Sequence, residues 1–262
     1  MLNKYIILIV ATLIIHFIDT LSYSVRLNSV KSGNFALSTS LFNLIVLISR
    51  TANTFQGPLI GHIIDDSVRS KYDPINNIRG VILAASGGTI LAIILIPTFL
   101  KLFEIGMKKL EVTGSVPSLV IQSLSISNIK RIAKNTIKPK KSMIKNLRYK
   151  NIPKRLLLLN ALITGVYTVG VLAANYASFM VPGKANAIVQ SSGLINGIAS
   201  ILLTLFIDPK SAIITDEAYR GKREYGDVKA LVIMLIGTKL LGTLLGQLLL
   251  VPSAKLLAFI YQ

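Results

Sequence analysis

Six apolar stretches, each long enough to cross a lipid bilayer, constrain the fold of this chain more than any other feature of its sequence. A helix needs about 20 residues to span roughly 30 Å of hydrocarbon. The second stretch is too long for an upright span, which predicts a tilt or a break near Gly57 and Pro58. The sequence therefore predicts an all-α, polytopic membrane protein with six transmembrane helices, near residues 5–25, 36–62, 80–103, 155–180, 185–207 and 229–251.

Most of the charge lies between these stretches. The chain has 29 Lys and Arg against 11 Asp and Glu, a net charge of +18, yet 52% of its residues are hydrophobic and 15% are charged. Soluble domains average about 25% charged residues. The composition therefore disfavours a soluble enzyme and a basic nucleic-acid-binding domain, and we expect no nucleic-acid partner.

The distribution of the basic residues predicts the topology. Loops 1–2, 3–4 and 5–6 share one side of the membrane and hold 21 of the 29, with Arg26 counted in loop 1–2. The opposite side holds 6, and the remaining two, Arg50 and Lys239, lie inside spans. The positive-inside rule then places the basic loops in the cytoplasm and both termini outside.

The long third loop divides the chain. We expect a first three-span half over residues 1–106, a basic linker over residues 107–154 and a second three-span half over residues 155–262. Within the linker, apolar and basic residues alternate at helical spacing, which predicts an amphipathic cytoplasmic helix held on the membrane by anionic inner-leaflet lipids. Its role is open between topological anchoring and binding of a specific headgroup. The apolar face is Ile126, Ile129, Ala133 and Ile137, and the basic face is Lys130, Arg131, Lys134 and Lys138.

Short segments of the two halves resemble each other. Residues 38–45 of the second stretch match residues 191–198 of the fifth, so that Asn43 corresponds to Asn196. Three spans in each half would give the halves opposite orientations, as in many secondary transporters. Two interpretations stay open: two inverted three-helix repeats, or chance similarity between apolar helices.

Ionisable residues at bilayer depth cost roughly 2.5 kcal/mol or more each, so each is a candidate functional residue. In the first span, Thr12, His16, Asp19 and Tyr23 follow 4-3-4 spacing and form one polar stripe. Asp19 is the one acid inside any predicted span, and His16 lies one turn away. The pair is a candidate for proton or ion coupling. The alternative for each residue is a structural contact that fixes helix packing.

Depth along the helices decides which cation can pair with Asp19. At 1.5 Å per residue, Asp19 lies about 9 Å, Lys239 about 15 Å and Arg50 about 21 Å from the inner ends of their spans. Lys239 can therefore reach Asp19, whereas Arg50 lies too far outward unless its helix tilts. An arginine without a resident acid suits an anionic ligand, and its two-pronged donors match phosphate. Pairing with backbone carbonyls or an unrecognised carboxylate is the alternative.

Polar and small side chains form stripes on five of the six spans, which favours a hydrated cavity over close packing alone. The motifs GxxxxGK[ST], HExxH and GxSxG are absent, and the chain has no cysteine. We therefore expect a protein that is not an enzyme and has no metal and no cofactor. Besides Arg50 and Lys239, the candidate substrate-binding residues are Asn43, Asn53, Gln56, Gln190 and Asn196.

Two polar segments resemble the Amj family of six-span bacterial lipid II flippases. One is IHFIDTLSYS at residues 15–24, followed by Arg26 and Leu27; the other is LFN at residues 41–43, followed by SRTAN at residues 49–53, Gln56 and Pro58. The resemblance implies transport of undecaprenyl-pyrophosphate linked to the peptidoglycan disaccharide-pentapeptide, from the inner to the outer leaflet of the bacterial cytoplasmic membrane. The chemistry inferred from the residues is compatible with this substrate: we expect Arg50 and Lys239 to receive the pyrophosphate, and the Asn, Gln and Ser faces of the second, fourth and fifth spans to bind sugar and peptide.

Several points stay open beside this interpretation. The mechanism we expect is alternating access by inverted halves, with energy from the membrane potential or from protons at Asp19 and His16. A homodimer is compatible with so large a headgroup. The alternatives are a carrier of another polyprenyl-phosphate or amphiphile, a non-transporting membrane scaffold, and an intramembrane enzyme, which needs a second acid or nucleophile at the depth of Asp19.

Overall fold

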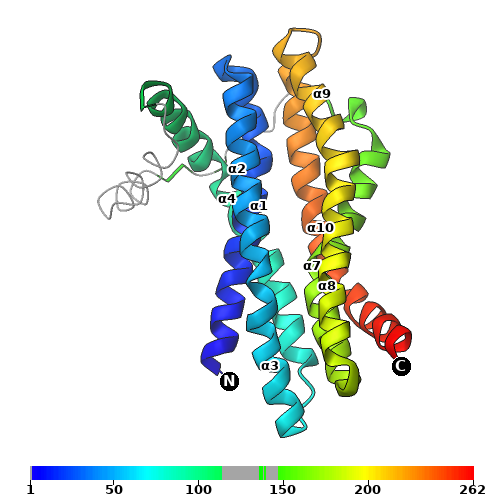
Figure 1. The fold of residues 1–262 in the computed structure, drawn as a ribbon. Helices are drawn as coiled ribbons and strands as arrows, with labels where there is room; N and C mark the ends of the chain where they lie inside the picture. The colour runs from blue at the N-terminus through cyan, green and yellow to red at the C-terminus, as the bar shows by residue number, and fades with distance from the viewer. Residues whose placement is uncertain (1, 114–135, 138, 140–146) are drawn as a thin grey trace.

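The structure, a computed structural model, describes residues 2–113, 136, 137, 139 and 147–262. Every regular element among these residues is helical, and the long helices stand roughly side by side (Figure 1). Two 3₁₀ turns, η2 (Tyr149–Asn151) and η3 (Pro182–Lys184), and a π-helical turn, η4 (Leu203–Ile207), lie between them. The helices are α1 (Leu2–Ser32), α2 (Phe35–Thr54), α3 (Gln56–Ser70), α4 (Ile75–Thr113), α7 (Lys154–Met180), α8 (Ala185–Leu202), α9 (Asp208–Tyr219) and α10 (Tyr225–Tyr261).

Within the described part of the chain, six helical stretches are long and apolar enough to cross a membrane: Asn3–Ser32, Phe35–Ser70, Ile75–Lys109, Lys154–Met180, Pro182–Tyr219 and Tyr225–Tyr261. The prediction of an all-α, six-span membrane protein is confirmed. Both termini lie at one end of the bundle, and the ends of α1, α4 and α9 lie at the other (Figure 1). We call the latter the basic-loop end.

The second span is broken at Phe55, between α2 and α3. Pro58 explains the break, because it has no N–H to donate to the carbonyl of Thr54 and its ring crowds that carbonyl. The N–H of Phe55 instead closes a tighter turn onto the carbonyl of Ala52, at 3.1 Å. Of the two alternatives that the sequence left for this span, a tilt or a break, the chain adopts a break.

The fifth span is longer than the sequence predicts. The apolar run ends near residue 207, but the helix continues through the π-helical turn η4 and α9 to Tyr219. Pro209, the second residue of α9, lacks the N–H that a regular helix needs at that position, and η4 accommodates the interruption. Asp208 therefore lies inside this span, which corrects the prediction that Asp19 is the single acid within the spans.

The two halves share several structural features. α1 packs mainly against α4 and α2, and α7 packs mainly against α10 and α8. α4 contains Pro97 and α10 contains Pro252, and the end of each helix turns away from the bundle, on opposite sides and at opposite ends (Figure 1). The second span of each half is interrupted near its middle.

In each half, a glycine allows two helix backbones to approach closely. A Cβ on Gly88 of α4 would lie 2.2 Å from the carbonyl oxygen of Leu13 in α1. A Cβ on Gly242 of α10 would lie 2.5 Å from the carbonyl oxygen of Ala161 in α7. Since backbone atoms cannot rotate away, only glycine permits these approaches.

We predict that Gly88→Ala lowers the free energy of unfolding by about 1–3 kcal/mol, because α1 and α4 must move apart. The neighbouring Gly87 is a matched control, since a Cβ there meets nothing within 4 Å. Gly87→Ala is expected to leave stability unchanged or to raise it by up to about 1 kcal/mol through helix propensity. Thermal unfolding of the purified variants in one detergent measures the difference. Equal stability of the two variants would contradict the close crossing.

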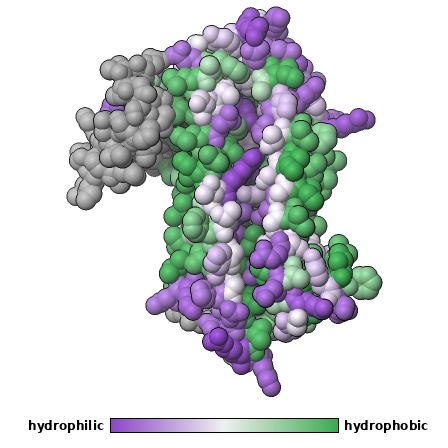
Figure 2. Space-filling view, in the orientation of Figure 1, coloured by the Kyte–Doolittle hydropathy of each residue, from purple (hydrophilic) through white to green (hydrophobic). Residues whose placement is uncertain are grey.

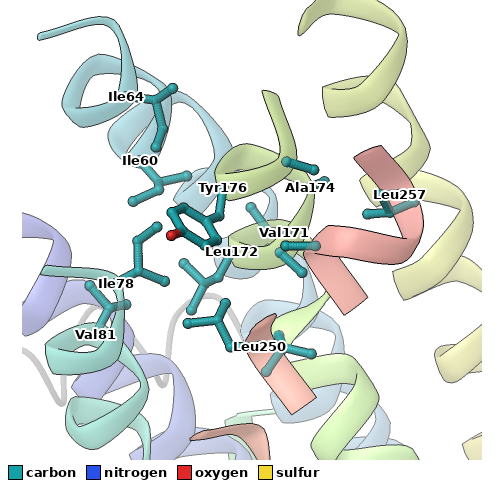
Figure 3. Close-up of a cluster of buried hydrophobic side chains, with 14 of the residues drawn as sticks. Ile60, Ile64, Ile78, Val81, Val171, Leu172, Ala174, Tyr176, Leu250 and Leu257 are labelled. Atoms are coloured by element: carbon teal, nitrogen blue, oxygen red, sulfur yellow. The ribbon is translucent and has the colours of Figure 1, made fainter. Parts of the chain in front are cut away.

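An apolar core closes the end of the bundle that carries the termini. The ring of Tyr176 from α7 lies among Ile60 of α3, Ile78 of α4 and Leu172 of α7 (Figure 3). Residues from α10, including Leu250 and Leu257, complete this cluster. The cavities described below lie instead at the middle of the bundle and toward its basic-loop end.

The linker is described in part. Its predicted amphipathic helix lies outside the described residues, except for Ile137, whose N–H donates to the Thr98 hydroxyl at 2.8 Å. At the linker's far end, Arg148 forms an ion pair with Glu224 and lies 3.6 Å from Asp227 at the start of α10. The hydrogen bond to Glu224 raises the pKa of the Arg148 guanidinium.

Candidate functional site

A polar furrow runs down one face of the molecule between two hydrophobic flanks (Figure 2). A pocket at mid-depth of the bundle has walls that come from α1, α2, α7 and α10 and from the junction of η4 with α9. An exposed polar surface of this kind is unusual on helices long enough to span a membrane, because polar groups of such helices normally face protein. The lining residues are His16, Asp19, Ser22, Tyr23, Phe42, Val46, Arg50, Thr164, Tyr167, Leu203, Asp208 and Lys239.

An ion pair joins α1 to α10 in this pocket. The Nζ of Lys239 donates to Oδ2 of Asp19, as the sequence predicts. The lysine side chain is 2% exposed, whereas the aspartate side chain is 29% exposed to the pocket. The ring of Tyr23 lies 5.4 Å from the ammonium, and its hydroxyl donates to Oδ1 of Asn160 at 3.3 Å. Asn160 in turn donates to the carbonyl of Leu235 at 2.9 Å, so the pair is held in a network that ties α1, α7 and α10 together.

Arg50 enters the same pocket, contrary to the depth predicted from the sequence. The spans extend farther toward the basic-loop end than the apolar runs indicate. Counted from Ser32, Phe35 and Tyr225, residues Asp19, Arg50 and Lys239 lie about 20, 22 and 21 Å deep. The three charged groups therefore share one level, and no tilt is needed to bring them together.

Arg50 carries a charge without a carboxylate partner. Among the residues that the structure describes, its side chain makes no hydrogen bond or ion pair, although it interacts electrostatically with the hydroxyls of Tyr23 and Tyr167. The two acids of the pocket, Asp19 and Asp208, are each paired with another cation. The pocket thus presents one guanidinium available to an anion.

A second ion pair, which the sequence does not predict, lies toward the basic-loop end of the pocket. Nη2 of Arg26 donates to Oδ1 of Asp208 at 3.2 Å, and the guanidinium lies 4.3 Å from the centre of the Phe42 ring. Arg26 is 7% exposed and belongs to α1, so its assignment to loop 1–2 is wrong. Its position was available as a signal, because Arg26 extends the 4-3-4 polar stripe by three more residues.

Asp208 also bears on the intramembrane-enzyme alternative. The sequence shows no second acid at the depth of Asp19, but the structure places Asp208 in the same pocket. General acid–base work needs a carboxyl group that can exchange a proton with a substrate. Both carboxylates here accept hydrogen bonds from cations, so the arrangement favours a role in positioning charges over acid–base chemistry.

The remaining predicted site residues divide by location. His16 lines the pocket, and its buried Nδ1 has no hydrogen-bond partner among the described residues. Asn53 is buried and interacts with Tyr167, and Asn43 lines an adjoining cavity.

The other three amides lie outside both cavities. Gln56 is buried, and its Nε2 donates to the Thr12 hydroxyl at 2.9 Å, a contact between α3 and α1. Asn196 packs against Gly170 of α7, where an added Cβ would lie 2.2 Å from its Oδ1. Gln190 is exposed on α8 and lines neither cavity.

Comparison with known proteins identifies a relative and a family. A family model described as "Amj: Alternate to MurJ" matches residues 11–261. A protein of Bacillus subtilis (strain 168) named "Lipid II flippase Amj" is 38% identical over 250 residues, which cover 95% of this chain and 93% of that protein. No solved structure matches the chain.

Proposed function

Because the chain belongs to the Amj family, we propose that it is a lipid II flippase of the bacterial cytoplasmic membrane. It moves the polyprenyl-pyrophosphate-linked peptidoglycan precursor from the inner to the outer leaflet. The basic loops face the cytoplasm and both termini lie outside, in keeping with the positive-inside rule. In this proposal the protein transports its substrate without making or breaking a covalent bond.

The observation that carries this proposal is Arg50 in the mid-depth pocket. An amphiphile crosses a bilayer at low cost only if its headgroup follows a polar path while its tail stays in hydrocarbon. The furrow supplies such a path, since its polar floor is flanked by hydrophobic surface (Figure 2). Arg50 supplies at mid-depth a guanidinium with no carboxylate partner among the described residues, and its donors match two phosphate oxygens.

Neighbouring groups extend this binding site. Lys239 offers a second cation, which Asp19 holds at the same level until an anion competes for it. Thr164, Tyr167 and Asn43 offer hydroxyl and amide groups to the sugars and the peptide. Gln56 and Asn196 act in helix packing in this proposal, because their amides face other helices.

Alternating access by two inverted three-helix halves is the mechanism that we propose. Its support is the shared pattern of interrupted second spans, prolines at Pro97 and Pro252, and glycine crossings at Gly88 and Gly242. The apolar core around Tyr176 closes the outer end, and the polar cavities lie toward the basic-loop end. In the proposed cycle the chain starts in an inward-facing state, and rocking of the halves about the pocket exposes it outward.

Transport by the purified chain tests the function. The protein is reconstituted in vesicles with fluorescent lipid II, and a membrane-impermeant reductant bleaches the outer leaflet. We expect the protein to raise the bleachable fraction above half over time. Unlabelled lipid II should compete, whereas better competition by undecaprenyl phosphate would indicate another polyprenyl-phosphate as substrate. No flipping by well-folded protein would favour a scaffold. The mass of the purified particle, measured by light scattering, distinguishes a monomer from the homodimer that the sequence leaves open.

A further inference from the structure

A second cavity, of about 240 Å³, adjoins the pocket on the side of the basic-loop end. It lies between α1, α2 and α9, and Phe42 and Asp208 line both cavities. Its volume is several times the roughly 30 Å³ that one water occupies in the liquid. Most of the surface that faces this cavity is apolar, and three of its four hydroxyls donate to carbonyls of their own helices. One cation and one acid also line it. The lining residues are Val25, Arg26, Ser29, Phe35, Ser38, Thr39, Phe42, Asn43, Asp208, Pro209, Ala212 and Thr215.

Two buried polar groups of this lining lack partners. Nη1 of Arg26 has no hydrogen bond among the described residues, although Nη2 is bound to Asp208. The hydroxyl of Ser38, which is 0% exposed, likewise has no partner in the described part of the chain. Buried polar atoms are normally satisfied, and leaving them unsatisfied destabilises the fold. A ligand that accepts hydrogen bonds would remove both penalties.

The backbone adds positive potential at the same place. Phe35 and Ser38 belong to the first turn of α2, a 20-residue helix whose N-terminal N–H groups have no side-chain cap. The N-terminus of a helix carries partial positive charge and favours phosphate. Arg26, Ser38 and this helix end together present donors from two different helices to one cavity.

We propose that this second cavity is an entry site for the pyrophosphate of the substrate, which it receives from the cytoplasmic leaflet before Arg50 does. This inference rests on the proposed function and adds a separate binding step to it. Arg26 then releases Asp208 and binds a phosphate oxygen. Once Asp208 is released, the two cavities connect at Phe42 and Asp208, which line both of them. A phosphate ester of an anionic phospholipid has similar chemistry, so the test must distinguish the two sources.

The chain has no tryptophan, so one introduced indole reports on one site. Phe35→Trp places the reporter in the second cavity, and Val46→Trp places it in the mid-depth pocket. Each full-length variant is held in nanodiscs of phosphatidylcholine and titrated with farnesyl pyrophosphate, with farnesol as the control that lacks phosphate. We expect a saturable fluorescence change in the Phe35→Trp protein with farnesyl pyrophosphate and none with farnesol.

Ser38→Ala in the Phe35→Trp protein separates binding from folding. Because the serine hydroxyl is unpaired, its removal should leave the melting temperature unchanged or higher, yet weaken farnesyl pyrophosphate binding about tenfold. Ser49→Ala is the matched control on the same helix, since that hydroxyl donates to the carbonyl of Ile15 at 3.2 Å. Ser49→Ala should lower the melting temperature and leave farnesyl pyrophosphate binding by the Phe35→Trp protein unchanged.

Arg26→Lys keeps the charge but loses the two-pronged donor, and should weaken farnesyl pyrophosphate binding about tenfold.

Three results would overturn the entry site. The first is a response of Val46→Trp alone, which leaves the proposed function standing. The second is a Phe35→Trp response that Ser38→Ala and Arg26→Lys do not alter. The third is a response to nanodiscs containing phosphatidylglycerol with none to farnesyl pyrophosphate, which assigns the cavity to a resident phospholipid. Failure of the proposed function differs from all three, because it is a loss of lipid II flipping by the wild-type protein.

Discussion

Arg50→Ala is expected to reduce lipid II flipping in reconstituted vesicles at least tenfold, with no loss of folded protein. A hydrogen bond to a charged group contributes about 1.5–3 kcal/mol, which corresponds to roughly 10- to 150-fold in binding. Arg50 has no carboxylate partner among the described residues, so its removal leaves no buried acid without its ion-pair partner. The melting temperature should therefore stay within about 2 °C of the wild type.

Two further variants sharpen this prediction. Arg50→Lys retains a point charge without the two-pronged donor, so it should keep part of the activity. Thr51→Ala changes the adjacent, exposed residue of α2 and should flip lipid II at the wild-type rate. Wild-type flipping by a stable Arg50→Ala protein would show that Arg50 does not bind the substrate and that the binding site lies elsewhere.

The ion pair between Lys239 and Asp19 leads to the largest expected effect on stability. Removal of one partner from a buried pair costs about 3–5 kcal/mol, because the other charge remains without compensation. Lys239 is 2% exposed and Asp19 is 29% exposed. Asp19→Asn, which strands the more deeply buried charge, should therefore destabilise the protein by about this amount, and Lys239→Met by less.

The double variant Asp19→Asn/Lys239→Met isolates the functional part of the pair. Replacement of both charges should restore most of the stability that Asp19→Asn loses, as a double-mutant cycle of thermal or denaturant unfolding measures. If the pair serves transport, the restored protein should still flip lipid II slowly. Restored stability with full flipping would make the pair structural. Flipping that keeps the wild-type pH dependence would count against proton coupling at Asp19 and His16.

The sequence predicts the number and kind of helices well, because each span needs a long apolar run and the spacing of such runs does not depend on tertiary contacts. It predicts the partner of Asp19 for a similar reason, since a buried lysine must find a carboxylate. The break in the second span lies near Gly57 and Pro58, where the sequence predicts either a tilt or a break. The spans and the break are local features. The Asp19–Lys239 pair joins residues 220 apart and is predictable because both lie at similar depths in their helices.

The errors arise at helix ends, where hydropathy is a weak guide. Polar residues such as Arg26 and Asp208 can continue their helices into the membrane because they pair with each other. That pair joins two different helices, so it is a tertiary contact. The spans predicted from hydropathy are too short. They therefore place Arg26 in a loop, leave Asp208 outside the fifth span, and put Arg50 and Asp19 at different depths. Asp208 lines both cavities and Arg26 lines the second, so the spans drawn from hydropathy end where the two cavities meet.

Accessibility of lipid II in cells tests the central claim most directly. Cells are made to depend on this chain as their sole lipid II flippase, and a periplasmic enzyme that cleaves lipid II measures the fraction on the outer face. The account predicts that wild-type protein maintains this fraction and that Arg50→Ala, at equal protein level, collapses it with accumulation of inner-leaflet lipid II. An outer-face fraction that does not change when the wild-type chain is depleted would contradict it.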